Sequence, residues 1–228
     1  MKNIKYIGIF LCTLFFLTAC EKETEGVSGI IHFELLGEPT ALVSLGTAYQ
    51  EPGYKVIYRD EDVSTEVKVA GTIDANRVGL YTLAYSYANK DGVKTTQTRE
   101  VIVADPSVTT DIAGNYLTAD GTFRLASGAT ENYPGFKVSI SKIATGFFGI
   151  SDFLGGYYAQ KRGNGAAYAC NGYIQLKNDN TITLLSSSIL PWKDTLTGVT
   201  EGKYDPVTGV VSWKAEYAGM FFTVVLNK

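Results

Sequence analysis

The sequence predicts an all-β protein, and three observations support that prediction. Gly and Tyr are abundant, with 24 and 15 residues. Val and Thr, which favour strands, recur along the chain, whereas no long run of Ala, Leu, Glu and Lys has helical spacing. Short runs of alternating apolar and polar residues are separated by turn residues. The 228 residues suffice for two domains that each bury a core.

Residues 1–19 have the composition of a signal peptide. Two lysines precede an apolar run, residues 6–19, that is too short to span a bilayer as a permanent helix. Leu17, Ala19 and Cys20 then resemble the processing site of bacterial lipoproteins, where a diacylglycerol is transferred to the Cys thiol and the chain is cut before it. The resemblance implies that Cys20 carries lipid. Secretory cleavage elsewhere, or a short membrane anchor, is the alternative.

Residues 20–27 are the expected lipidated Cys and flexible tether. Residues 21–25 are charged or polar, without a large apolar side chain, which is typical of a solvated spacer. A Lys among acids directly after the lipidated Cys also resembles the export signal that sends lipoproteins of Bacteroidetes to the outer face of the outer membrane. We therefore expect a lipid-anchored protein of the outer membrane that faces the cell exterior. A spacer without export information is the alternative.

Charge and cysteine content narrow the choice of partners. The formal net charge is -3, and removal of Lys2 and Lys5 lowers the Lys and Arg count from 20 to 18 against 23 acids, so the mature chain carries -5. No basic block remains, so nucleic acid is not an expected partner. Cys12 is lost with the signal peptide and Cys20 carries lipid. Cys170 is then left without a disulfide partner and is expected in the core.

Residues 28–105 predict a β-sandwich of the immunoglobulin (Ig) type, with about seven short strands and no cysteines. The candidate strands are residues 30–36, 41–45, 54–58, 67–69, 80–87 and 98–103. In the fifth of these, alternate side chains are expected to face the core, namely Tyr81, Leu83, Tyr85 and Tyr87. The turn residues 89–92 predict a hairpin after this strand.

The same residues resemble the Ig-like domains of bacterial surface proteins. The resemblance covers most of the segment and lies in residues 45–54, 71–74, 78–85 and 99–105. It implies a spacer or binding module without catalytic residues. Pro52 and Gly53 predict a turn with Gly53 at positive φ. The pattern Gly79-x-Tyr81 places a tyrosine where a strand begins, as in the tyrosine corner of Ig-like sandwiches.

Residues 106–112 are the expected linker, because Pro106 and small polar residues end one pattern before another starts. Residues 113–228 then predict an antiparallel meander that closes as a small barrel or folds as a sandwich, since an open sheet would expose a long edge. The turn that ends at Gly209 is the clearest hairpin signal, with Asp205 as its cap. The candidate strands are residues 116–117, 121–125, 136–143, 147–150, 168–176, 181–185, 197–204, 210–217 and 221–226.

This second half resembles the C-terminal domain of Bacteroidetes lipoproteins of unknown function that are often found beside glycan-uptake systems. The resemblance lies in residues 113–116, 151–158, 189–192, 202–205, 208–209 and 211–213. It implies a cell-surface location and a role with carbohydrates or in adhesion. It brings no catalytic residue.

No pattern points to an enzyme, a metal or a cofactor. His32 is the single histidine, which excludes a Ser-His-Asp relay and a multi-histidine metal centre, and it is expected as an ordinary strand residue. The acidic run 60–62 lacks the spaced oxygen ligands of a calcium loop, so we expect a solvated turn. Carboxylates that could form an acid and base pair lie in no motif that fixes their separation. They are Asp152, Asp194, Asp205 and Glu216.

The segment 147–158, followed by polar residues 161–165, is the most suggestive for binding. Aromatic faces can stack on sugar rings, while neighbouring Asp, Asn and Arg side chains can hydrogen-bond to hydroxyls. The alternative is that the aromatics fill the core, which we expect for Phe147, Phe148 and Phe153. The candidate ligand-binding residues are Asp152, Tyr157, Tyr158 and Trp192. Trp192 follows a proline in a loop, so it is expected to be more exposed than Trp213.

These features predict a lipid-anchored, non-enzymatic binding protein on the cell surface. The Ig-like domain is expected to act as a spacer and the C-terminal domain to bind a glycan. The alternative is an adhesin or structural accessory lipoprotein that binds a protein partner of an outer-membrane uptake complex.

Overall fold

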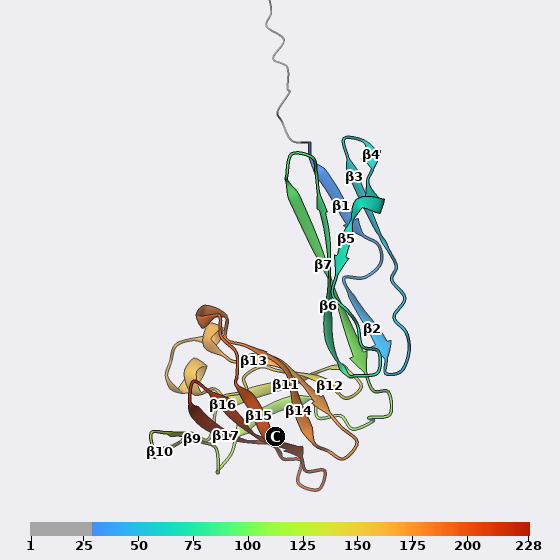
Figure 1. The fold of residues 1–228 in the computed structure, drawn as a ribbon. Coiled ribbons are helices and arrows are strands. Elements are labelled where there is room, and N and C mark those ends of the chain that lie inside the picture. The colour runs from blue at the N-terminus through green and yellow to red at the C-terminus, as the bar shows by residue number, and fades with distance from the viewer. Residues whose placement is uncertain (1–28) are drawn as a thin grey trace, which may run out of the picture.

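The structure is a computed structural model that describes residues 29–228. The expected signal peptide, Cys20 and the tether therefore lie outside the described residues. Strands form two successive bodies, one from the N-terminal half and one from the C-terminal half (Figure 1). The all-β prediction is confirmed. Within residues 29–228, no helix is long and apolar enough to cross a membrane.

The N-terminal body consists of two facing sheets, which confirms the predicted Ig-like sandwich. One sheet has the order β1-β3-β4. Its strands are β1 (Ile31–Leu35), β3 (Tyr54–Tyr58) and β4 (Glu61–Asp62). The other has the order β2-β7-β6-β5, in which β2 and β7 are parallel. Its strands are β2 (Thr40–Ser44), β5 (Lys68–Ala70), β6 (Gly79–Ala88) and β7 (Lys94–Ala104), and the 3-10 turn η1 (Ser64–Glu66) precedes β5.

Most predicted local features of this domain are present, but the acidic run 60–62, expected as a solvated turn, is partly a strand because Glu61 and Asp62 pair with β3 as β4. On β6, Leu83, Tyr85 and Tyr87 are buried as expected, and Tyr81 is half-buried. The Tyr81 hydroxyl donates a 2.8 Å hydrogen bond to the carbonyl of Arg77, four residues earlier, which is the geometry of a tyrosine corner. His32 lies on β1 as an ordinary strand residue. Gly53 has φ +101°, which only glycine adopts without strain, so its predicted positive φ is confirmed, although residues 51–53 are not assigned as a turn.

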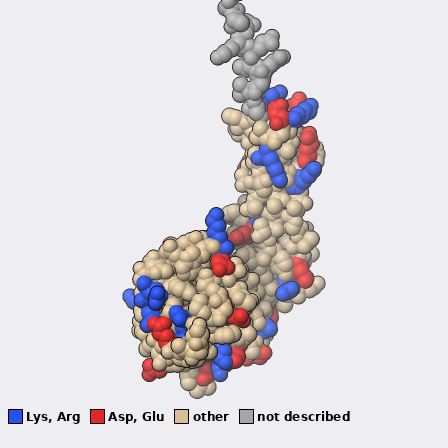
Figure 2. All heavy atoms as spheres, turned by 60° about the vertical axis from the view of Figure 1, so that its left-hand side comes forward, with Lys and Arg blue, Asp and Glu red and all other residues tan. Residues whose placement is uncertain are grey.

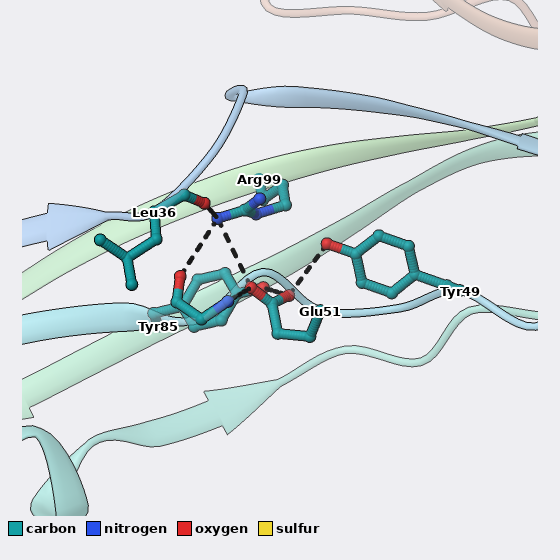
Figure 3. Close-up of polar contacts among 6 residues, drawn as sticks. Leu36, Tyr49, Glu51, Tyr85 and Arg99 are labelled. Atoms are coloured by element: carbon teal, nitrogen blue, oxygen red, sulfur yellow. Dashed lines mark hydrogen bonds and ion pairs between the residues drawn. The ribbon is translucent and has the colours of Figure 1, made fainter.

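A buried arginine joins strand β7 to the loops on either side of β2 (Figure 3). Arg99 is 0% exposed, and its Nη2 donates to the Leu36 carbonyl at 2.6 Å and lies 3.4 Å from Glu51 Oε1. Glu51 Oε2 accepts hydrogen bonds from the hydroxyls of Tyr49 and Tyr85. Burial alone would raise the pKa of Glu51. Hydrogen bonds from Tyr85, the Gly53 N–H and Tyr49, together with the Arg99 charge, hold that pKa below its ordinary value.

The C-terminal body is a sheet of ten strands, and every pair in it is antiparallel, as predicted. Its main order is β10-β9-β17-β8-β11-β12-β13-β14, with β15 and β16 branching from β17. The strands are β8 (Gly114–Thr118), β9 (Phe123–Ala126), β10 (Ala129–Asn132), β11 (Lys137–Ala144), β12 (Phe147–Ile150), β13 (Asn171–Leu176), β14 (Ile182–Ser188), β15 (Gly198–Tyr204), β16 (Val211–Tyr217) and β17 (Met220–Asn227).

This sheet curls into a half-barrel rather than lying open. Strand β14 ends the main order and β15 ends the branch, and the residues beside them meet at a bridge between Thr181 and Lys203. The Tyr204 N–H also donates to the Asn180 carbonyl at 2.9 Å. The core inside the curl includes Trp213, whose Nε1 donates to the Phe153 carbonyl at 2.8 Å. Between the barrel and the sandwich left open by the sequence, the structure therefore favours the barrel-like form.

A second tyrosine corner opens the C-terminal sheet. The Tyr116 hydroxyl donates a buried 2.7 Å hydrogen bond to the Ile112 carbonyl, and burial raises the pKa of Tyr116 to about 12. The spacing Gly114-x-Tyr116 repeats the spacing Gly79-x-Tyr81 of the first domain. Each corner fixes the chain where a sheet-forming strand begins.

An apolar cluster joins the two bodies, and we call it the interdomain cluster. Its N-terminal members are Leu45, Val78, Leu80, Ile102 and Ala104, and its C-terminal members are Ala144, Phe147, Tyr173 and Leu185. The expected linker, residues 106–112, packs against the C-terminal domain. Val108 and Ile112 are buried in the C-terminal core, and Asn178 donates to the Ser107 hydroxyl at 2.8 Å. In Figure 1, β6 and β7 run down to the C-terminal domain at this contact.

Candidate functional site

Three short helical turns of the C-terminal domain gather at its upper left in Figure 1, apart from the N-terminal strands. They are η2 (Tyr157–Lys161), η3 (Ala166–Tyr168) and η4 (Leu190–Trp192). The first is a π-helical turn, since the N–H of Lys161 donates to the Gly156 carbonyl at 3.0 Å and the N–H of Arg162 donates to the Tyr157 carbonyl at 2.9 Å. Such turns are frequent at functional sites. Gly156, at φ +80°, allows the chain to enter it.

Six aromatic side chains meet where these turns adjoin strands β16 and β17, and we call them the aromatic cluster. They are Tyr157, Tyr158, Tyr168, Trp192, Tyr217 and Phe222. Trp192 has three ring neighbours at centroid distances of 4.9 Å for Tyr158, 5.0 Å for Tyr168 and 6.3 Å for Tyr217. Two of these contacts are edge-on, and Tyr217 lies nearly parallel at 13°. Trp192 is nevertheless 41% exposed, so it is both fixed in place and accessible.

The structure corrects the expectation that Tyr157 contacts a ligand. Tyr157 is 0% exposed, and its hydroxyl donates to Glu131 at 2.7 Å while Arg124 lies over its ring, 5.0 Å from the centroid. It meets Tyr158 edge-on at 5.0 Å. A fully buried ring has no free face for stacking. Tyr157 therefore packs against the half-buried Tyr158 from the core side.

Charged side chains border the aromatic cluster. Glu131 pairs with Lys161 at 3.0 Å and with Arg124 at 3.7 Å. The pKa of Glu131 lies below its ordinary value, because Tyr157 and Lys161 hydrogen-bond to the carboxylate and both cations attract it. Burial raises the pKa of Tyr158, and the positive charges of Arg124 and Arg162 oppose that rise. Figure 2, which brings this side forward, shows basic side chains gathered with acidic ones on a largely uncharged surface.

Asp152 is also placed differently from the expectation of ligand contact. It is 3% exposed, and its Oδ1 accepts hydrogen bonds from the N–H groups of Leu154 at 2.9 Å and Cys170 at 3.3 Å. Its Oδ2 has no partner within residues 29–228. Burial raises the pKa of Asp152 to about 7, although these backbone hydrogen bonds oppose the shift. Asp152 is a turn carboxylate that joins two loops of the core.

The other sequence-predicted residues divide as expected between core and surface. Trp213 is 1% exposed, in contrast to Trp192. Phe148 and Phe153 lie in the C-terminal core, and Phe147 is buried in the interdomain cluster. Cys170 is buried as predicted, and burial raises the pKa of its thiol to about 12.

Three members of the aromatic cluster were not predicted as site residues, namely Tyr168, Tyr217 and Phe222. Phe222 is a fully buried residue of β17. Tyr217 ends an alternating strand and therefore has the sequence pattern of a core residue. Tyr168 was expected to begin a strand, but it lies in η3, and β13 begins at Asn171. The glycines before it, at positions 163 and 165, indicated a loop there.

The described residues offer no set of ligands for a metal ion. Within residues 29–228, no group of three or more His, Cys, Asp and Glu side chains is suitably placed. Asp205 caps its turn as predicted, since its Oδ1 accepts from the N–H of Val207 at 2.9 Å. Asp194 hydrogen-bonds to Tyr217, and burial followed by this contact raises the pKa of Tyr217 to about 12.

An Ig-like sandwich joined to a curled antiparallel sheet, with an exposed aromatic site, defines a two-domain protein of the surface-lipoprotein class. The model of the Ig-like domain of bacterial surface proteins matches residues 33–103, and the model of a C-terminal domain family matches residues 105–228. The crystal structure of the lipoprotein BT2262 from Bacteroides thetaiotaomicron is 36% identical, with a TM-score of 0.50, over 87% of this chain and 100% of that chain. The chain belongs to the family of this lipoprotein, which confirms the resemblance predicted from the sequence.

Two structures of Clostridium perfringens ZmpB also match part of the chain. One contains its M60 catalytic domain with CBM51-1 and CBM51-2, at 15% identity and a TM-score of 0.30, over 54% of this chain and 14% of that chain. The other contains CBM51-2 in complex with GlcNAc and INT domains, at 16% identity and a TM-score of 0.28, over 53% of this chain and 29% of that chain. Similarity of this extent carries no weight for the site. No curated protein matches the sequence.

Proposed function

We propose that this protein is a lipid-anchored, non-enzymatic binding protein of the cell surface that binds a glycan at the aromatic cluster. The observation that carries the proposal is the environment of Trp192, which three tyrosine rings hold while 41% of the residue stays exposed. A sugar ring can stack on such an indole. Because Trp192 is already ordered, binding loses little side-chain entropy.

The arrangement of the domains supports the same function. The helical turns that carry Tyr158, Tyr168 and Trp192 lie at the upper left of the C-terminal domain, apart from the N-terminal sandwich, so that sandwich leaves the site uncovered (Figure 1). In the proposal, Cys20 is lipidated and inserted in the outer membrane, and the Ig-like domain is the spacer that holds the site away from the bilayer.

The acidic residues of the site favour binding over hydrolysis. Glu131 is engaged by Lys161, Arg124 and Tyr157, Asp194 contacts Tyr217, and Asp152 is buried. Glycoside hydrolysis needs two carboxyl groups that face each other across a substrate. The described residues around Trp192 present no such pair.

A glycan array probed with the chain that begins after Cys20 tests the proposal. That chain contains both domains and every described residue. We expect binding to at least one glycan class, and Trp192→Ala should weaken it by tenfold or more, since stacking on one aromatic contributes about 1–3 kcal/mol. Leu117→Ala is the matched control, because Leu117 is 48% exposed on β8 and lies outside the aromatic cluster. It should bind as the unchanged chain does.

Two results would contradict glycan binding. One is the absence of binding to any glycan by a chain that is folded by circular dichroism. The other is equal binding by the Trp192→Ala variant. Absence of binding would favour the alternative, in which the exposed Trp192 and Leu190 contact a protein partner of an outer-membrane uptake complex.

A further inference from the structure

We infer that the aromatic cluster accepts an anionic glycan, and that Arg162 pairs with the negatively charged group of the sugar. This inference rests on the proposed function, because it uses the same site. It adds the chemical class of the ligand and a residue that selects it.

The charges around the site are unequal. The positive charges of Arg124 and Arg162 act on Tyr157 and Tyr158, and Lys161 pairs with Glu131. Two carboxylates lie beside these three cations, namely Glu131 and Asp194, which hydrogen-bonds to Tyr217. Glu131 is shared by Arg124 and Lys161, which leaves Arg162 without an ion pair within residues 29–228. The site therefore has an excess of positive charge, although the whole chain has a formal charge of -3. The positive charge at the site is therefore local, because the net charge of the whole chain would repel anions.

Arg162 is held beside the cluster by its backbone. Its N–H donates to the Tyr157 carbonyl at 2.9 Å, which closes the π-helical turn that also carries Tyr158. Arg162 is exposed, yet its positive charge opposes the rise that burial causes in the pKa of Tyr157 and of Tyr158. Tyr158 in turn contacts Trp192 at 4.9 Å. A cation with a fixed backbone and a free side chain therefore lies beside the proposed stacking surface.

A guanidinium suits this task better than an ammonium does. Its planar fork donates two parallel hydrogen bonds to a carboxylate, and such charge-assisted pairs are stronger than bonds to neutral hydroxyls. A sulfate ester presents oxygen atoms of similar chemistry. The shared feature is a sugar that carries an anionic oxygen group while its ring packs against the aromatic cluster. Carboxylated and sulfated sugars are the two sources of that group.

The test compares neutral, carboxylated and sulfated glycans on one array, using the chain that begins after Cys20. We expect anionic glycans to be bound in preference to their neutral counterparts, with binding that weakens as salt rises. Arg162→Gln should reduce binding of the anionic glycan by about tenfold or more. Arg77→Gln is the matched control, since Arg77 is exposed in the first domain and has no ion pair in the described part of the chain. It should bind normally.

The outcomes separate this inference from the proposed function. Binding restricted to neutral glycans, or anionic binding that survives Arg162→Gln, overturns the inference and leaves glycan binding intact. Absence of all glycan binding overturns both. The relative binding of carboxylated and sulfated members then identifies which anionic group the site takes.

Discussion

The guanidinium of Arg99, which is 0% exposed, lies 3.4 Å from the carboxylate of Glu51, whose side chain is 31% exposed. A buried guanidinium needs an oppositely charged partner, because removing it from water costs more free energy than contacts with neutral groups supply. Two further nitrogens of Arg99, Nε and Nη1, have no partner in the described residues. The pair therefore makes the first domain sensitive to small changes at Glu51.

We expect Glu51→Gln to lower the free energy of unfolding by about 1–3 kcal/mol, since it removes the negative charge and leaves Arg99 charged. Glu201→Gln is the control, because the Glu201 pair with Lys214 is exposed on both sides and should contribute less than about 1 kcal/mol. Urea titration of both variants measures the difference. Equal losses in the free energy of unfolding would mean that the burial of Arg99 does not strengthen its dependence on Glu51.

The two tyrosine corners should differ in energy although their geometry is alike. Tyr116→Phe leaves the buried carbonyl of Ile112 without its donor and should cost about 1–3 kcal/mol. Tyr81→Phe removes an exposed bond, which water can replace, and should cost about 0.5 kcal/mol. Chemical denaturation followed by tyrosine fluorescence compares them. A larger loss for Tyr81→Phe would contradict the role of burial.

Asp152 should make stability depend on pH. Its folded pKa, about 7, lies above its ordinary value of 3.8, so the folded state binds the extra proton between these values. The stability that the protonated Asp152 contributes is fully present below the unfolded pKa, and it is lost as pH rises to about 7. We therefore expect Asp152→Asn, which keeps the Oδ1 acceptor, to match the unchanged protein near pH 4. Near pH 8 it should be more stable by about 2–4 kcal/mol.

Asp205→Asn is the control for this pH dependence. Asp205 accepts from the N–H two residues later, as Asp152 does, but it is only half-buried. A hydrogen bond from Thr208 and another from the N–H of Val207 lower its pKa. Its contribution is therefore present at neutral pH and lost in acid, which is the opposite sign. Thermal unfolding from pH 4 to pH 8 checks both, and a constant gap between Asp152→Asn and the unchanged protein contradicts the prediction.

Phe147 should couple the two domains. Phe147→Ala creates a cavity in the interdomain cluster and should cost about 3–5 kcal/mol of stability. We expect calorimetry to show one transition for the unchanged protein and two for the variant, with faster proteolysis at residues 105–112. Leu42→Ala is the control, since Leu42 is exposed on β2. Two transitions in the unchanged protein would show that the cluster does not couple the domains.

Cys20 should determine where the protein resides. Labelled palmitate should be incorporated into the unchanged protein and not into Cys20→Ala, because the Cys20 thiol is the proposed acceptor of the diacylglycerol. Protease added to intact cells should digest the unchanged protein if it faces the exterior. Protection in intact cells, with digestion after lysis, would place the protein on an inner face.

The periodicity of the sequence predicted most of the fold because alternation reports which side of a strand is buried. Tyr85 and Trp213 show this directly, since both lie on alternating strands and both are buried. Strand β10 was not predicted, because its residues Ala129–Asn132 carry little apolar character and pair only with β9 at the edge of the sheet.

The site was less predictable than the fold for a different reason. The sequence identified Tyr158 and Trp192, which the structure brings to 4.9 Å. It could not show that Tyr157, the residue before Tyr158, points inward, because the direction of each side chain in the π-helical turn depends on hydrogen bonds between residues five apart. Arg162 was visible only as part of a polar run.

The interdomain cluster has a mechanical consequence. In the proposed function, a ligand attached to a larger polymer pulls on the C-terminal domain, and the lipid on Cys20 resists at the other end of the chain. Because Phe147 and Leu80 pack across the junction, the domains cannot swing about residues 106–112 until those side chains separate. The two domains should therefore move as one rigid body under load. The orientation of Trp192 is then set by that rigid body and not by bending at the linker.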